Sequence, residues 1–331
     1  MTGGSRVPAL PPVGIGTAPF GRLYTPVSAR TVAATLEAAR AAGIGYLDTA
    51  PGYGDGLSEE RIGRHLAASG TRPVISTKVG TVVDALPPLD LGDPDAVTME
   101  PGRVHRGWSV ADVRRSVADS LARLRVDAVD VALLHDPETH EDEAATTAYE
   151  ALRQLRVEGV IGAIGVGCNH VDVATRFVER LDLDYVLIAG RYTLLDHSAL
   201  DDLLPRALDR GTRIIAAGVF NTGILASGQP GDRFHYRPAP DHIRERVGRL
   251  VELCDRHGVE LGAAAAQFPS GHPAVASTVV GMRSPDEVLA NVEALRRPIP
   301  ATFWDELRER ALLPATAPVP RVAPLMSGGL P

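Results

Sequence analysis

Short apolar runs alternate with longer amphipathic stretches along almost the whole chain. The runs are rich in Ile, Val and Leu, which is typical of strands buried on both faces of a parallel sheet. Eight such strands are expected, at residues 13–17, 46–48, 74–78, 131–135, 164–166, 185–189, 214–216 and 278–280. Because a helical pattern follows each of them, the sequence predicts an α/β fold, a closed (β/α)8 (TIM) barrel that forms one domain over residues 1–331.

Several helix boundaries can be predicted from single residues. Ser28, Ser58 and Ser109 each precede an apolar stripe at helical spacing, so each is expected to be an N-cap. Gly43 is expected to end the first of these helices. Further helices are expected near residues 147–158, 171–181, 198–210, 241–257 and 284–295.

Two segments interrupt the alternation. Residues 81–107 contain Pro87-Pro88, Pro94 and Pro101 and are too long for a plain connection, which is typical of a functional loop. The tail from about residue 314 is rich in Pro, Gly and Ala, which favours a disordered end over a flap across the barrel mouth.

Composition limits the kinds of partner. The net charge is −7 and no basic block is present, which argues against a nucleic-acid partner. No apolar stretch approaches the roughly 18 residues that a membrane span needs. Cys168 and Cys254 form neither a disulfide framework nor a zinc site. We therefore expect a cytoplasmic protein that acts on a small molecule, without a metal.

Polar residues close three of the predicted strands. Asp48, Lys78 and His135 each end an apolar run, and Tyr53 follows on the loop after the first. The carboxyl ends of barrel strands share one rim, where active sites lie. A lysine–aspartate pair alone is more often structural, but together the four side chains could move a proton. Lys78 should lower the phenol pKa of Tyr53, and the His135 imidazole could bind the same oxygen.

The segment 45–54, Gly-Tyr-Leu-Asp-Thr-Ala-Pro-Gly-Tyr-Gly, is followed by Ser58-Glu59. It resembles the signature of the aldo-keto reductases, and the resemblance extends from about residue 13 to about residue 295. It implies hydride transfer between a nicotinamide cofactor and a carbonyl or alcohol. It also implies that Tyr53 is the general acid/base, Lys78 tunes it, Asp48 holds Lys78, and His135 orients the substrate oxygen.

The same resemblance implies a set of cofactor residues. Cys168 and Asn169 take the place of a Ser–Asn pair that holds the nicotinamide carboxamide, and Tyr192 aligns with an aromatic that stacks on the nicotinamide. Ala189 replaces a glutamine that most members carry. The other expected cofactor residues are Gly16, Thr17, Asp48, Gly218, Val219, Phe220, Asn221, Gly223, Leu225, Gly281, Met282, Arg283, Ser284, Glu287 and Asn291. No Gly-x-Gly-x-x-Gly motif follows a strand, so an open dinucleotide-binding fold is not supported.

The residues after the last predicted strand bear on the choice of cofactor. Ser284 and Glu287 have the spacing of a capping box, and Glu287 aligns with a position that is arginine in many phosphate-binding members. A carboxylate there disfavours the 2′-phosphate of NADP, whereas Arg283 would attract it. NAD is therefore expected, with NADP possible.

Three segments, 189–195, 218–225 and 279–285, are similar to the branch that contains the L-fucose, D-threo-aldose and pyridoxal 4-dehydrogenases. The resemblance implies oxidation of a sugar hemiacetal at C1. An aldehyde or ketone reductase, a pyridoxal 4-dehydrogenase and a non-catalytic cofactor-sensing subunit are the alternatives. The residues expected to line the substrate pocket are Phe20, Tyr24, Trp108, Asp136 and Phe220.

Overall fold

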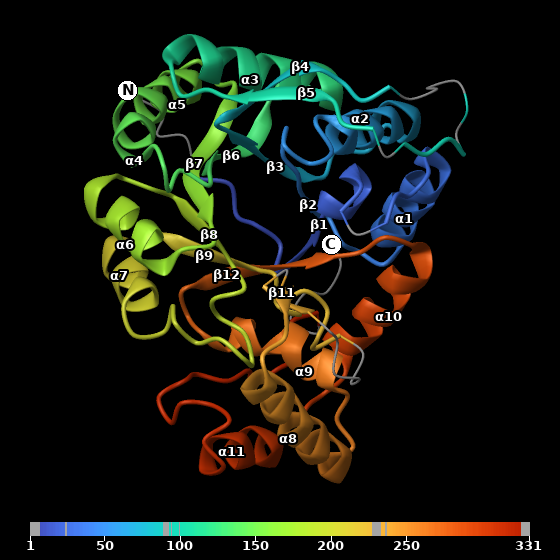
Figure 1. Ribbon diagram of the computed structural model, residues 1–331, viewed down its shortest axis with the longest axis vertical. Helices are drawn as coiled ribbons and strands as arrows, with labels where there is room; N and C mark the ends of the chain where they lie inside the picture. The colour runs from blue at the N-terminus through green and yellow to red at the C-terminus, as the bar shows by residue number, and fades with distance from the viewer. Residues whose placement is uncertain are drawn as a thin grey trace.

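The computed structural model describes residues 7–23, 25–88, 93, 95–98, 100–226, 233–235 and 237–325. Parallel strands form a closed barrel at its centre (Figure 1). They are β1 (Val13–Gly16), β2 (Tyr46–Asp48), β3 (Val74–Val79), β6 (Val129–His135), β7 (Ile161–Cys168), β8 (Tyr185–Ala189), β9 (Arg213–Ala217) and β12 (Val275–Gly281). Strand β1 pairs with both β12 and β2, which closes the barrel. The predicted (β/α)8 barrel is confirmed, and each predicted strand overlaps one of these.

Helices surround the barrel (Figure 1). They are α1 (Ala29–Ala41), α2 (Leu57–Ser69), α3 (Val110–Leu124), α4 (Glu141–Glu143), α5 (Tyr149–Val157), α6 (Val171–Arg180), α7 (Leu203–Arg210), α8 (Asp241–His257), α9 (Leu261–Gln267), α10 (Pro285–Arg296) and α11 (Ala301–Glu309). The sequence did not predict α9 or α11. A π-helical segment, Ala144–Ala148, joins α4 to α5. The helix expected near residues 147–158 therefore begins earlier, at Glu141. Helix α7 begins later than expected, because residues 199–202 form turns.

Two of the three predicted serine caps are confirmed. The hydroxyl of Ser28 accepts from the backbone N–H of Thr31, and that of Ser109 accepts from Asp112 in a capping box. The prediction for Ser58 is wrong, because α2 already begins at Leu57. Ser58 is buried, and its hydroxyl donates to the backbone of Thr17 (3.0 Å) and bonds the Thr17 hydroxyl (2.9 Å). A buried hydroxyl needs such partners, and here they tie α2 to the end of β1.

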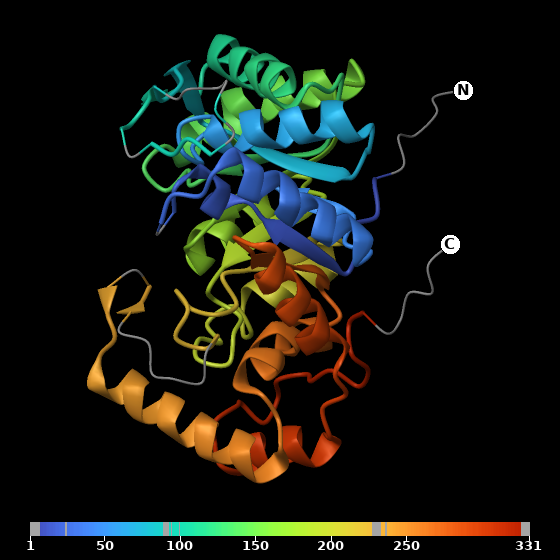
Figure 2. The same cartoon turned by 90° about the vertical axis from the view of Figure 1, so that its right-hand side faces the viewer.

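The long loop at 81–107 has its own secondary structure at both ends. Strands β4 (Thr81–Ala85) and β5 (Arg103–Arg106) pair antiparallel, with Thr81 opposite Arg106. A second short ribbon is formed by β10 (Arg233–Phe234) and β11 (Arg237–Pro238). Both ribbons lie on the opposite side of the molecule from the first and last described residues (Figure 2).

The tail is ordered as far as it is described. Ala317 is buried and its carbonyl oxygen accepts from Arg308 (2.8 Å), while the backbone at Val319 lies against Gly271. Leu325 packs beside the cluster that contains Val13, the first residue of β1. The expectation of disorder is therefore wrong for residues 314–325, and this part of the tail reaches the amino-terminal end of the barrel. Residues 326–331 lie outside the described residues.

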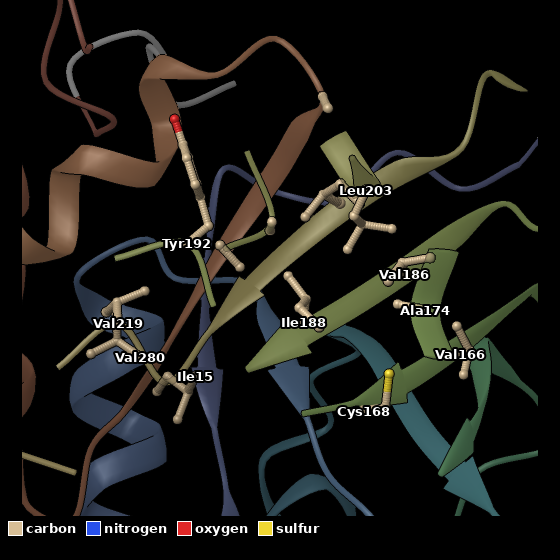
Figure 3. Packing of buried hydrophobic residues seen from close by; sticks show 14 of the residues in the cluster. Ile15, Val166, Cys168, Ala174, Val186, Ile188, Tyr192, Leu203, Val219 and Val280 are labelled. Carbon is tan, nitrogen blue, oxygen red and sulfur yellow. The ribbon is translucent and has the colours of Figure 1, made fainter. Parts of the chain in front are cut away.

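Alternating side chains of the strands divide the core into two layers. Tyr46, Leu133, Tyr185 and Leu187 belong to a cluster inside the barrel. The intervening residues pack outwards against the helices, as Figure 3 shows for part of that layer. This alternation turns every second residue near a strand end towards the barrel mouth. In the described part of the chain, no helix is long and apolar enough to cross a membrane, and no group of His, Cys, Asp and Glu could hold a metal ion.

Candidate active site

The four residues predicted to handle a proton lie together at the barrel mouth. Asp48 ends β2, Lys78 lies near the end of β3, His135 ends β6, and Tyr53 lies in the turn after β2. The Lys78 ammonium is 2.8 Å from Asp48 Oδ2 and 2.9 Å from the Tyr53 hydroxyl. The Tyr53 and His135 rings meet edge to face, with centroids 5.9 Å apart.

Lys78 is held by four contacts. Its ammonium donates to both oxygens of Asp48, to the carbonyl oxygen of Thr49 (2.7 Å) and to Tyr53. Of the 34 Lys and Arg residues in the chain, Lys78 is the only lysine. An ammonium is a compact charge that meets several acceptors at once, which the planar guanidinium of arginine cannot reproduce.

Two residues that the sequence did not single out support Asp48. The hydroxyl of Ser76 donates to Asp48 Oδ1 (2.7 Å), and the Tyr46 hydroxyl lies 2.9 Å from the Ser76 oxygen. Because the carboxylate can only accept, Ser76 donates to it and Tyr46 donates to Ser76. Tyr46 and Ser76 each lie two residues before a site residue on a strand, and this spacing could have indicated them.

The pKa of Tyr53 differs from the value expected from the sequence. Burial lowers the pKa of Lys78, but Asp48 and Tyr53 outweigh it, and the net pKa lies above the ordinary value. Burial raises the pKa of Tyr53 to about 12, and Lys78 is the strongest influence in the opposite direction. The expectation that Lys78 brings the Tyr53 pKa below its ordinary value is therefore wrong for the protein alone. Tyr53 is a protonated phenol at neutral pH, with its oxygen accepting from Lys78.

His135 is a neutral imidazole. Burial, followed by the charges of Lys78 and Arg106, holds the pKa of His135 well below its ordinary value. Nδ1 is buried without a partner in the described part of the chain, and Nε2 lies 3.6 Å from Asp136 Oδ2. An unpaired buried N–H is costly, so the proton belongs on Nε2. His135 can therefore donate a hydrogen bond to an oxygen at the mouth.

Two adjoining cavities open at the site. The first, the mouth cavity, has a volume of about 650 Å³ and contains Tyr53, Lys78 and His135 in its wall. The second, the long groove, has a volume of about 910 Å³ and runs from Asp48 and Tyr53 to the amino end of α10. The two share Ala18, Leu23, Tyr53, Leu187 and Ala189.

Most of the expected binding residues line these cavities. The long groove contains Gly16, Asp48, Gly218, Val219, Phe220, Gly223, Gly281, Arg283, Glu287 and Asn291. The mouth cavity contains Asp136, Cys168 and Asn169. Burial raises the pKa of the Cys168 thiol to about 12, so it is not a reactive thiolate. The mouth cavity is also lined by residues that the sequence did not indicate, notably Arg22, Asp55 and Pro101.

Other expected binding residues do not reach either cavity. Thr17, Phe20, Trp108, Tyr192, Asn221, Leu225, Met282 and Ser284 line neither cavity. Ser284 is the N-cap of α10 and accepts from the N–H of Glu287. Asn221 donates to the carbonyl oxygen of Gly190 (3.4 Å). Tyr24 lies outside the described residues.

The aromatic residues differ most from expectation. Tyr192 is 1% exposed and packs on Phe268, with ring centroids 4.8 Å apart. Figure 3 shows its ring directed away from Cys168, so the structure does not place it for stacking on a nicotinamide. Phe20 is fully buried in the core, and Trp108 is buried beneath the guanidinium of Arg106, 5.1 Å from its ring. Burying the apolar surface of these three rings is favourable, and all three lie in the core.

Comparison with known proteins agrees with this geometry. The chain is 42% identical to D-threo-aldose 1-dehydrogenase of Pseudomonas sp., with 92% of this chain and 95% of the relative covered. It is 40% identical to pyridoxal 4-dehydrogenase of Microbacterium luteolum, with 91% and 94% covered. The solved structure of glycerol dehydrogenase from Gluconobacter oxydans is similar at a TM-score of 0.71 and 25% identity, covering 93% of this chain and 96% of that one. The model of the Aldo/keto reductase family matches residues 12–311, and the protein therefore belongs to that family of NAD(P)-dependent oxidoreductases.

Proposed function

We propose that this protein oxidises a cyclic aldose at C1 to the lactone, with fucose-like aldoses as the best substrates and NAD as the preferred cofactor. The observation that carries the proposal is a mouth cavity in which the neutral His135 and the phenol of Tyr53 adjoin the polar side chains of Asp136 and Asn169. A ligand with several hydroxyl groups suits such a wall better than an apolar aldehyde does. The 42% identity to a D-threo-aldose 1-dehydrogenase supports the same substrate class.

In the proposed reaction, Tyr53 and His135 both contact the C1 hydroxyl of the sugar. The hydroxyl proton passes to the Tyr53 oxygen, the C1–H hydrogen leaves as hydride, and the C1–O bond becomes double. A nicotinamide held in the long groove beside Asp48 and Tyr53 would supply the hydride acceptor. Lys78 stabilises the phenolate form in which Tyr53 can accept the proton, and the sugar ring oxygen stabilises the positive charge that develops at C1.

The long groove fits an extended dinucleotide. It begins at Asp48 and Tyr53, where the reacting ring must lie, and it ends beside α10. Gly218 and Gly223, with φ of 62° and 97°, line the groove and carry no side chain, so a phosphate could approach the backbone there. Beyond them, the wall includes a set of apolar side chains that suit a flat base: Val251, Cys254, Val259 and Leu261.

The proposed preference for NAD rests on an ion pair at the end of the groove. Arg283 donates to Glu287 Oε1 from both Nε (2.9 Å) and Nη2 (2.7 Å), and its backbone N–H donates to Oε2 (2.8 Å). A guanidinium held in this way has little capacity left for a 2′-phosphate, and the carboxylate would repel that group.

Releasing Arg283 should change the choice of cofactor. We expect Glu287→Gln to raise the ratio of kcat/KM with NADP to that with NAD by about tenfold, which corresponds to ~1.4 kcal/mol, and Glu287→Arg to raise it further. Glu293→Gln is the matched control, because Glu293 lies on the same helix as Glu287 but pairs with Arg297 outside the groove. Paired kinetics with both cofactors would measure this. A wild type that already prefers NADP would contradict the proposal.

A substrate panel tests the proposed reaction. The purified protein would be assayed with NAD and NADP against aldoses and pyridoxal in the oxidising direction and against simple aldehydes in the reducing direction. We expect reduced nicotinamide from L-fucose and related aldoses. The 40% identity to a pyridoxal 4-dehydrogenase makes pyridoxal the second candidate. Efficient turnover of pyridoxal or simple aldehydes, with no aldose oxidised, would refute the sugar assignment.

A further inference from the structure

We propose that Asp136 selects substrates that carry a hydroxyl group on the carbon next to the reacting carbon, and that Arg106 is the positioning residue that holds it for this purpose. The inference deepens the proposed function, because a C2 hydroxyl is a general feature of the aldoses that it names. Selection by Asp136 also applies to the reduction of open-chain hydroxyaldehydes. An experiment can therefore contradict the proposed aldose oxidation without contradicting the role of Asp136, and the reverse.

The two carboxylates in the described wall of the mouth cavity differ in their partners. Asp55 is 2.7 Å from Arg22 and also accepts from the backbone N–H of Gly102 (2.9 Å). Asp136 forms no ion pair with an arginine or lysine in the described part of the chain. Within the described residues, the one hydrogen bond to its carboxylate is a long one, from Asn169 Nδ2 to Oδ1 (3.4 Å). Its side chain is 42% exposed and faces the cavity. A carboxylate has about four acceptor sites, so Asp136 has acceptor capacity for a ligand.

The position of this carboxylate determines which hydroxyl it could bind. Asp136 Oδ2 lies 3.6 Å from His135 Nε2, the nitrogen that donates to the reacting oxygen. Vicinal oxygens on a sugar are neighbours, so a substrate oxygen on His135 places the next hydroxyl beside Asp136. Asn169 contacts the other carboxylate oxygen, Oδ1, so Oδ2 accepts no hydrogen bond from it.

The backbone at Asp136 is held in an unusual conformation. Its φ is 46°, in the left-handed region that residues other than glycine rarely adopt. Its N–H donates to Gly167 (2.8 Å), and Arg106 Nη2 donates to the carbonyl oxygens of both His135 and Asp136 (2.7 Å each). Arg106 thus clamps the turn from β5 without neutralising the carboxylate. Strain that the surrounding structure maintains in this way is typical of functional sites.

The charges around Asp136 make its acceptor capacity depend on pH. Burial, followed by the charge of Glu138, raises the pKa of Asp136 to about 6, although Lys78, Arg106 and His170 act in the opposite direction. The neighbouring His135 is neutral. The ionised carboxylate is the better acceptor, so selection for the hydroxyl should be complete well above pH 6. It should weaken as the pH falls through this value.

The experiment compares two aldehydes that differ by one hydroxyl. Lactaldehyde and propanal would be reduced by the wild type and by Asp136→Ala, with kcat and KM measured separately at pH 7.5. We expect the wild type to prefer lactaldehyde by kcat/KM. The variant should lose at least about tenfold of that preference, mainly through a higher KM for lactaldehyde, and kcat/KM for propanal should fall by a smaller factor. L-Fucose and 2-deoxy-L-fucose form the same comparison in the oxidising direction.

Controls separate selection from damage. Glu138→Gln removes one negative charge, as Asp136→Ala does, but from a residue outside both cavities. This variant should keep the preference for lactaldehyde at pH 7.5. Because Glu138 raises the pKa of Asp136, the pH at which half of the preference is lost should fall. Arg106→Met should reduce the preference as Asp136→Ala does, and Arg106→Lys should restore part of it. If Asp136→Ala lowers kcat/KM for lactaldehyde and propanal by the same factor, the inference is overturned. If no aldose is oxidised but the aldehyde preference depends on Asp136, only the proposed aldose reaction fails.

Discussion

Tyr53→Phe is expected to lose at least about 10²-fold in kcat while it still binds the dinucleotide, because general acid–base catalysis contributes typically 10²–10⁴-fold. The substitution removes one oxygen from the wall of the mouth cavity and leaves the ring in place. Lys78 keeps its contacts to Asp48 and Thr49, so the rest of the cluster should persist. Steady-state kinetics and quenching of protein fluorescence by the dinucleotide would measure the two properties.

The pH dependence provides a second measure of the same role. Because burial raises the pKa of Tyr53 to about 12, the phenolate is a small fraction at neutral pH. Oxidation by the protein should therefore accelerate as the pH rises from 7 to 9, and Tyr53→Phe should lack this dependence. Tyr149→Phe is the matched control, because its hydroxyl donates to the Asp182 carbonyl on the outer side of the barrel. Turnover by Tyr53→Phe close to that of the wild type would mean that another group transfers the proton.

Lys78→Met should have a similarly large effect on kcat and a further effect on stability. The ammonium is 1% exposed and is the cationic partner of Asp48, whose carboxylate would be left unpaired. Removing one partner of a buried ion pair typically costs about 3–5 kcal/mol. Lys78→Arg keeps the charge, but its planar group cannot meet Asp48, Thr49 and Tyr53 together, so we expect it to be nearly as inactive.

A double variant separates these two effects. Asp48→Asn combined with Lys78→Met leaves no unpaired charge, so its Tm should recover part of the loss while kcat does not recover. Thermal unfolding and steady-state kinetics of the wild type, both single variants and the double variant form a complete cycle. A Lys78→Met protein with normal turnover at reduced Tm would show that Lys78 only stabilises the fold.

The sequence by itself determined the barrel and the grouping of polar residues at its mouth. Apolar runs identify buried strands because the strand period is local, and a polar residue that ends such a run must lie at the rim where these strands end. Asp48, Lys78 and His135 could therefore be placed before any contact was known. Ser28 and Ser109 were predictable for the same reason, because a cap depends on residues within one helical turn.

Only the tertiary structure decided how the loop residues are oriented. Phe20, Trp108 and Tyr192 lie on segments without a regular period, so nothing in the sequence indicated whether each ring faces the cavity or the core. The free energy of burying an aromatic ring favoured the core. The tail after residue 314 depends likewise on contacts with distant residues such as Gly271.

The electrostatic state of the site was also a tertiary property. The sequence showed that Lys78 could influence Tyr53, but the pKa of the phenol depends on how much water the fold excludes, and burial has the larger effect. Arg106 reaches the Asp136 backbone from a hairpin 30 residues away in the chain. Local patterns thus identified which polar residues meet at the barrel mouth, and long-range packing determined their charge, orientation and supporting contacts.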